Sequence, residues 1–214
     1  MKIRVSTAAQ LGLFVVAMAY SLYMAAQLPD TVPTHWGLNG QPDSYGSKWM
    51  DLLLMPGVIL LMAALTPALA KISPSQFQVG AFEETYGYVA FLVGALMFAI
   101  HVVIVQASIG RHLDMTRLMM FVMFAFFALI GNVMGKIKRN FFMGIRTPWT
   151  LADERVWIAT HRYGGRLWLV GGVIGAIAAL IGVPFAILIA LLLVMAFLPI
   201  LKSYQLYQKL TPSP

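Results

Sequence analysis

Long apolar stretches alternate with shorter polar stretches along the chain. A helix that crosses the hydrocarbon core of a bilayer, about 30 Å thick, needs about 20 mainly apolar residues. Six stretches approach that length: Ser6–Ala26, Asp51–Ala70, Thr85–Ser108, Thr116–Met134, Leu167–Ile181 and Pro184–Leu201. The fifth is short and lies close to the sixth, so these two predict a helical hairpin. The pattern predicts an all-α fold, a polytopic membrane helix bundle of about six transmembrane helices.

The composition excludes several other classes of protein. Hydrophobic residues make up 60% of the 214 residues and charged residues 11%, whereas soluble domains are nearer about 45–50% and about 25%. The mean hydropathy is +0.79. An ordinary soluble enzyme, a disordered chain and a nucleic-acid-binding domain are therefore excluded. The net charge is +7, but the basic residues flank the apolar stretches, so the expected partner is the lipid bilayer and no direct contact with nucleic acid is expected.

The placement of Lys and Arg predicts the orientation in the membrane. Twelve of the 15 fall on one side of the predicted spans: Lys2, Arg4, Lys71, Lys136, Lys138, Arg139, Arg146, Arg155, Arg162, Arg166, Lys202 and Lys209. The other three, Lys48, Arg111 and Arg117, fall on the opposite side. Because basic residues are enriched in cytoplasmic loops, both termini are predicted to be cytoplasmic.

A cleaved signal peptide is the alternative interpretation of the N-terminal stretch, with small residues at Ala17 and Ala19 as the cleavage site. The apolar run continues to Ala26, past that site. We therefore expect the stretch to be retained as the first span. The chain contains no cysteine, which excludes disulfides, thiolate metal sites and cysteine nucleophiles.

The predicted outer loop, residues 27–50, is rich in residues that fix turns. Its candidate functional residues are Pro29, Asp30, Pro33, His35, Trp36, Gly40, Asp43 and Lys48. Asn39-Gly40 is a strong turn dipeptide. We expect an ordered loop, either a cap over the helix ends or a recognition surface for something that arrives from outside. Trp36, Tyr45 and Trp49 suit the headgroup level of the membrane.

The same loop raises the question of a metal site. His35, Asp30 and Asp43, together with His112 and Asp114 of the next outer loop, carry side chains that could bind a divalent metal. No helical HxxxH or HExxH spacing supports such a site. We expect neither a metal nor a cofactor.

The predicted inner loop, residues 131–166, is the most informative segment. Its irregular part is expected to form a structured knot that positions Arg146, because Pro148 disfavours the helical conformation at Thr147. Thr150 is predicted to cap a helix over Leu151–Tyr163, with Asp153 in a capping-box position, and Gly164-Gly165 is predicted to end it. The apolar side of this helix, Leu151, Trp157 and Ile158, could lie on the membrane surface.

His101 is the main ionisable residue well inside a predicted span. Polar side chains in a bilayer need partners, so an interhelical hydrogen bond is the simplest interpretation, with a proton-linked or ligand-contacting role as the alternative. Small residues at Gly171-x-x-x-Gly175 and Ala90-x-x-x-Gly94 predict close helix approach.

Two segments resemble known families. LPDTVPTHWGLNGQPDSYGSK, residues 28–48, resembles a short N-terminal domain of unknown function found in many bacterial membrane proteins. GNVMGKIKRNFFMGIRTPWTLADERVWIATHRYGG, residues 131–165, resembles the signature of the SdpI family. The residues that match this signature are Asn132, Asn140, Gly144, Arg146, Thr147, Pro148, Trp149, Thr150, Trp157 and His161. Arg139 departs from it, where members often carry proline. The resemblance divides the chain into a two-span unit, residues 1–80, and a four-span unit, residues 81–214.

The resemblance implies a function and a location. SdpI-family proteins are bacterial immunity and signal-transduction proteins of the cytoplasmic membrane. For this chain, the resemblance implies resistance to a secreted antimicrobial peptide toxin. It also implies a second partner, a cytoplasmic transcriptional repressor that the protein holds at the membrane. The alternative is a small transporter or a membrane enzyme that acts on a lipid or a small solute. The residues favour a protein that is not an enzyme, because no nucleophile with a base, paired carboxylates or metal set forms a motif, and no internal repeat indicates a transporter.

Overall fold

The computed structural model describes residues 1–37, 40–111 and 113–211. In these residues the elements follow in the order α1 (Ile3–Ala25), β1 (Thr31–Trp36), β2 (Pro42–Ser47), α2 (Lys48–Ile72), the 3-10 turns η1 (Ser75–Phe77) and η2 (Val79–Phe82), α3 (Glu83–Ser108), α4 (Met115–Met134), α5 (Pro148–Ala152), α6 (Glu154–Leu180) and α7 (Phe185–Leu210). All the α-helices except α5 are long and apolar enough to cross a membrane, which gives six candidate spans in the described part of the chain. The predicted all-α polytopic fold is confirmed.

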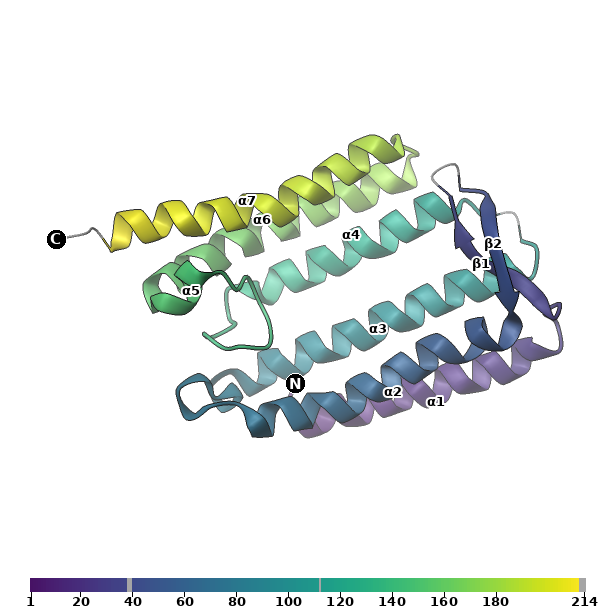
Figure 1. Ribbon diagram of the computed structural model, residues 1–214, viewed down its shortest axis with the longest axis horizontal. Coiled ribbons are helices and arrows are strands. Elements are labelled where there is room, and N and C mark those ends of the chain that lie inside the picture. Colours follow the sequence, from purple (N-terminus) through teal and green to yellow (C-terminus); the bar gives the residue numbers. More distant parts are fainter. Residues whose placement is uncertain (38–39, 112, 212–214) are drawn as a thin grey trace.

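The long helices form two groups of three that lie side by side (Figure 1). α1, α2 and α3 pack against one another, and α4, α6 and α7 form the second group, with α3 and α4 adjacent where the groups meet. The strands β1 and β2 lie at one end of the bundle, which we call the hairpin end. α5, the start of α1 and the end of α7 lie at the opposite end, which we call the motif end.

In its described residues, the loop between α1 and α2 contains an antiparallel β-hairpin that the all-α prediction did not include. Thr31 pairs with Ser47 and Trp36 with Pro42. Val32 turns inward and is completely buried among apolar residues of α1, α2 and α3. Gly40 has φ +74, whereas Asn39, the first residue of the predicted turn dipeptide, lies outside the described residues.

The prediction that Gly164-Gly165 ends a helix is wrong. α6 runs from Glu154 through both glycines to Leu180, so the fifth span is 27 residues long rather than short. Both glycines are sites of close approach. A Cβ at Gly165 would lie 2.9 Å from the carbonyl oxygen of Gly131 on α4. Close approach of two membrane helices depends on small residues at the contact.

The start of this segment also differs from the prediction. Thr147, rather than Thr150, is the N-cap of the first short helix, α5. Asp153 is the N-cap of α6, where its side chain accepts a 2.7 Å hydrogen bond from the backbone N–H of Arg155. The predicted Leu151–Tyr163 helix is therefore divided at Asp153. Trp157 does not lie on the membrane surface, because it is completely buried.

Trp157 belongs to the largest hydrophobic cluster, which joins the two helix groups at the motif end. The cluster contains Phe82 and Tyr86 from the start of α3 and Met134 from the end of α4.

The small residues of the predicted Gly171-x-x-x-Gly175 motif contact different helices, since Gly171 faces Met195 on α7 and Gly175 faces Phe124 on α4.

Candidate functional site

The segment that links α4 to α5, residues 135–147, is called the motif loop here, and Asn140 organises its first half. The Asn140 side chain is completely buried. Its Oδ1 accepts hydrogen bonds from the backbone N–H groups of Phe142 and Met143, at 2.8 and 2.9 Å. Its Nδ2 donates to the carbonyl oxygens of Lys138 and Met143. One amide thus satisfies four backbone groups, and it fixes a turn that has no regular secondary structure.

Two threonines fix the second half of the motif loop. The backbone N–H of Thr147 donates to Oγ1 of Thr150 at 2.9 Å, and the backbone N–H of Thr150 donates to Oγ1 of Thr147 at 3.2 Å. This reciprocal pair is a capping box, with Pro148 in the first helical turn. Thr147 Oγ1 also lies 3.0 Å from Oγ of Ser203, so the box is tied to α7.

His161 joins the motif loop to α6. Its Nε2 accepts a 3.0 Å hydrogen bond from the backbone N–H of Ile145. Its Nδ1 lies 2.8 Å from the carbonyl oxygen of Trp157, which can only accept, so Nδ1 carries the proton. The imidazole is stacked on the indole of Trp157, with centroids 4.0 Å apart. Both ring nitrogens are therefore used within the chain, and in this conformation His161 cannot serve as a metal ligand or a general base.

Gly144 makes this arrangement sterically feasible. Its φ is +102, which L side chains rarely adopt. A Cβ at this position would collide with Nε2 of His161. The glycine thus lets the loop backbone reach the imidazole.

The remaining residues of the signature lie outside this buried network. Arg146 is exposed and donates from its guanidinium to the carbonyl oxygen of Phe141. Pro148 is exposed, and Trp149 is half-buried against Tyr204 of α7 at a centroid distance of 4.9 Å. Asn132 is exposed on α4. The structure therefore divides the signature into residues that build the loop and residues that the loop displays.

Asp153 adds a charged feature at the start of α6. Its carboxylate forms an ion pair with Arg155, with Oδ2 and Nη2 2.7 Å apart. The hydrogen bonds that Arg155 donates are the main reason why the pKa of Asp153 is lowered to about 2. The carboxylate thus remains ionised at neutral pH, where it also suits the N-terminus of the helix.

The motif loop also contacts the connection between α2 and α3, a contact that the sequence did not predict. Arg139 donates a 3.1 Å hydrogen bond to the carbonyl oxygen of Leu151, and its guanidinium lies 5.4 Å from the centroid of the Phe77 ring. The rings of Phe77 and Phe141 are 4.3 Å apart. The only sequence signal for this contact was the departure from the family pattern at Arg139. No local pattern indicates Phe77 or Ser203.

At the hairpin end, the acidic and histidine side chains pair locally. His35 Nδ1 lies 2.5 Å from Oδ1 of Asp43 on the facing strand. Asp30 pairs with Lys48 at 3.0 Å, where the hairpin meets α2, and Asp114 pairs with Arg117 at 3.3 Å. These are three separate pairs, and no group of three His, Asp or Glu side chains occurs among the described residues. His112, also considered as a ligand, lies outside them.

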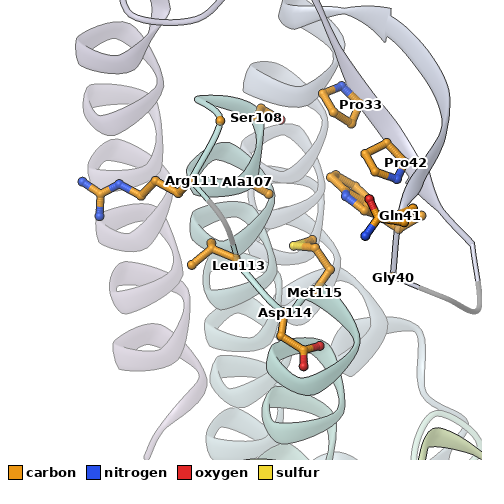
Figure 2. A pocket seen from close by; sticks show the side chains of 12 residues that line it. Pro33, Gly40, Gln41, Pro42, Ala107, Ser108, Arg111, Leu113, Asp114 and Met115 are labelled. Carbon is orange, nitrogen blue, oxygen red and sulfur yellow. The ribbon is translucent and has the colours of Figure 1, made fainter.

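Figure 2 shows a cavity of about 510 Å³ beneath the hairpin. Pro33 and Pro42 of the hairpin lie on one side, and the connection between α3 and α4 lines the other (Figure 2). Trp36 of β1 also lines the cavity. Pro33, Trp36 and Gly40 of the predicted recognition surface thus contribute to one hollow. Pro29 lies outside it, in the connection between α1 and β1.

His101 forms the expected interhelical hydrogen bond. Its Nε2 lies 2.9 Å from Oγ of Ser21 on α1, and this hydroxyl donates to the carbonyl oxygen of Leu52 on α2 at 2.7 Å. The imidazole also forms a T-shaped contact with the Tyr20 ring, with centroids 5.7 Å apart. His101 thus ties α1, α2 and α3 together towards the hairpin end. Nearby, Ser108 donates to Asp51, a second polar link between α2 and α3.

Comparison with known proteins supports both resemblances. Residues 136–203 match the SdpI/YfhL protein family, and residues 12–60 match a domain of unknown function, DUF1648. The Immunity protein SdpI of Bacillus subtilis is 27% identical over 207 residues, which cover 95% of this chain and 97% of that protein. An uncharacterized protein of Archaeoglobus fulgidus is 38% identical over 65 residues, which cover 29% of this chain and 35% of that protein. No solved structure matches the chain. The motif loop and the six membrane helices lie within this correspondence. The chain is a multi-pass plasma membrane protein that is similar to the SdpI/YfhL family over residues 136–203 and to DUF1648 over residues 12–60.

Proposed function

We propose that the chain is an immunity protein that gives resistance to a secreted antimicrobial peptide. The observation that carries this proposal is the correspondence with the Immunity protein SdpI, which extends over nearly the full length of both chains. Six membrane spans, the DUF1648 segment and the SdpI segment are all present. In this function the protein meets the peptide at or within the membrane, and no catalytic step is required.

The proposed orientation places the hairpin end outside the cell and the motif end in the cytoplasm. The basic residues support it, because the motif end contains most of them, including the motif loop and the last turns of α7. In this orientation the hairpin and the cavity beneath it are available to a peptide that arrives from outside. The loop that the SdpI signature builds is available to cytoplasmic partners.

We also propose that the motif loop presents a surface to a cytoplasmic transcriptional repressor. The exposed residues of the loop support this role: Arg146 and Pro148 are exposed, and Arg146 donates a hydrogen bond to the carbonyl oxygen of Phe141, which is exposed too. An arginine next to aromatic residues is typical of the residues that dominate protein interfaces. The buried residues Asn140, Thr150 and His161 hold the surface in place.

Survival of a sensitive bacterial strain tests the proposal. The strain expresses this chain, or an unrelated six-span membrane protein at the same membrane level, and is challenged with the secreted killing peptide of an SdpI-containing strain. We expect higher survival only with this chain. If well-expressed protein gives no protection but transports a solute in vesicles, the transporter alternative replaces the immunity proposal.

A further inference from the structure

The boundary between the two helix groups contains an apolar cavity. It measures about 200 Å³ and is lined only by α3 and α4. All of its lining side chains are apolar, and the small side chains of Ala95, Ala99 and Ala125 leave the space unfilled. Because no third helix contributes to the lining, the cavity faces the hydrocarbon core of the bilayer. We refer to this boundary between α3 and α4 as the seam.

A second cavity continues along the seam towards the hairpin end. Its volume is about 310 Å³. Ile104 of α3, Met119 of α4 and Phe185 of α7 line its apolar part, and the hairpin covers its top. On both α3 and α4, its lining residues lie closer to the hairpin end than those of the first cavity, so the two cavities are neighbours along the same seam.

The third hollow is the cavity beneath the hairpin that Figure 2 shows. It shares the lining residues Trp36 and Met115 with the second cavity, so the two cavities adjoin at these side chains. Its lining includes the polar side chains of Ser108 and Asp114. Along the seam, polarity therefore decreases from the hairpin end towards the middle of the bundle.

This order of polarity matches a lipid in the leaflet at the hairpin end. Met115 borders the cavity beneath the hairpin, and Phe121, the first residue of α4 that lines the apolar cavity, follows six residues later, which corresponds to about 9 Å at about 1.5 Å per residue. One leaflet contributes about half of the 30 Å hydrocarbon core. An acyl chain that starts below Met115 thus reaches the apolar cavity. A peptide helix, with a diameter of about 10 Å, does not fit inside a 200 Å³ hollow.

We propose that the seam binds one phospholipid, with its head group in the cavity beneath the hairpin and one acyl chain between α3 and α4. The acyl chain runs beside Trp36 and Met115, where the two cavities adjoin, and fills the space left by the three alanines. The site lies where the two helix groups meet, so the lipid is part of the packing between them. This proposal does not depend on the immunity function.

Photocrosslinking of the full chain in lipid vesicles tests the site. The vesicles contain phosphatidylethanolamine and phosphatidylglycerol with a trace of phospholipid that carries a diazirine at the end of one acyl chain. We expect crosslinks concentrated on the seam residues of α3 and α4, mapped by mass spectrometry of the digested protein. Even labelling of all lipid-facing helices, or recovery of a co-purifying peptide instead of lipid at the seam, would overturn the proposal.

Filling the cavity supplies the matched comparison. Ala99→Leu and Ala125→Leu add side-chain volume inside the seam, whereas Ala64→Leu makes the same change on an exposed face of α2. The two seam variants should lose most of the seam crosslinks, and Ala64→Leu should keep them. Unchanged labelling in the folded seam variants would contradict the site. Should they fail to fold, the crosslink map of the unmodified chain still decides.

Discussion

The imidazole Nε2 of His161, on α6, accepts a 3.0 Å hydrogen bond from the backbone N–H of Ile145, which lies in the motif loop 16 positions earlier in the chain. This contact attaches the motif loop to α6, together with the 2.8 Å hydrogen bond that the indole N–H of Trp157 donates to the carbonyl oxygen of Ile137. Ile145 is itself buried, and its carbonyl oxygen accepts a hydrogen bond from Thr150. The backbone N–H and the carbonyl oxygen of Ile145 are thus both hydrogen-bonded to side chains of the SdpI signature. The signature is, to this extent, a description of how the loop folds.

The first prediction tests this fastening through Gly144. Gly144→Ala should disrupt the loop, because the new Cβ would collide with His161 Nε2 and the positive φ would be strained. We expect destabilisation of about 1–3 kcal/mol, the typical cost of an unsatisfied buried donor or of backbone strain. The measurement is the thermal unfolding midpoint in detergent, together with amide hydrogen exchange at residues 140–150.

Gly135→Ala is the matched control. Gly135 ends α4 with an ordinary φ of −66, and a Cβ there would lie 3.6 Å from Arg162 Cγ, an ordinary contact. Its unfolding midpoint should stay close to that of the unmodified chain. Equal effects of the two alanine substitutions would show that the contact with His161 is not what makes Gly144 necessary.

A second prediction concerns the orientation in the membrane. The chain has no cysteine, so single cysteines can report accessibility. Ser44 is exposed on β2 and Ala152 is exposed at the end of α5. A membrane-impermeant maleimide should label Ser44→Cys in intact cells and Ala152→Cys only after permeabilisation. Thr160, at the same end as Ala152, is unsuitable because it is completely buried. Labelling of Ala152→Cys alone in intact cells would reverse the orientation.

Several features were predictable from the sequence because they depend on local composition. The length of an apolar run determines whether a helix can span the membrane, and five of the six expected spans agree with the structure apart from their ends. The ordered loop before α2 was also indicated by its prolines and glycines, although its pairing as a β-hairpin was not. The SdpI signature marked a structured segment in the right place.

The features that were missed depend on contacts between distant residues. A glycine pair can end a helix or allow two helices to approach closely. At Gly164-Gly165 the second applies, because Gly131 of α4 packs against Gly165. Likewise, the sequence does not reveal which signature residues face inward. Thr150 and His161 are completely buried, whereas Arg146 is exposed. The exposed residues are the better candidates for contact with a partner.

A third prediction is that Arg146 contributes to partner binding rather than to the stability of the fold. Arg146 is exposed, so Arg146→Ala should change the free energy of unfolding by less than about 0.5 kcal/mol. The same change should reduce co-purification of a cytoplasmic repressor. Arg146→Lys should not restore it, because a lysine cannot reproduce the planar set of donors. Full recovery in the lysine variant would leave charge alone as the explanation.

A fourth prediction concerns His101 and the transporter alternative. His101→Gln retains a donor that can reach Ser21, so we expect normal membrane levels and normal protection. His101→Leu removes the hydrogen bond within the bundle and should lower the unfolding midpoint; such interhelical bonds contribute on average about 0.6 kcal/mol. A proton-linked carrier would instead lose activity in both variants. Loss of protection in well-expressed His101→Gln would therefore contradict the structural role.

The last prediction separates the two ends of the molecule. Trp36→Ala and Asp43→Asn alter the hairpin end, the first by removing a wall of the cavity and the second by weakening the pair with His35. Both should reduce survival in the peptide challenge and leave repressor co-purification unchanged. Arg146→Ala should reduce repressor co-purification and leave survival unchanged, because a cytoplasmic repressor can reach only the motif end in the proposed orientation.

The membrane level of each variant decides whether these losses can be interpreted, since a destabilised bundle would lower both readouts together. Asp43→Asn is the stricter test at the hairpin end, because Asp43 is exposed and its substitution removes no buried contact. If hairpin and motif variants at normal membrane levels lost protection and repressor binding to the same extent, the two ends would not act separately. The peptide and the repressor would then have to act through one shared conformation of the bundle.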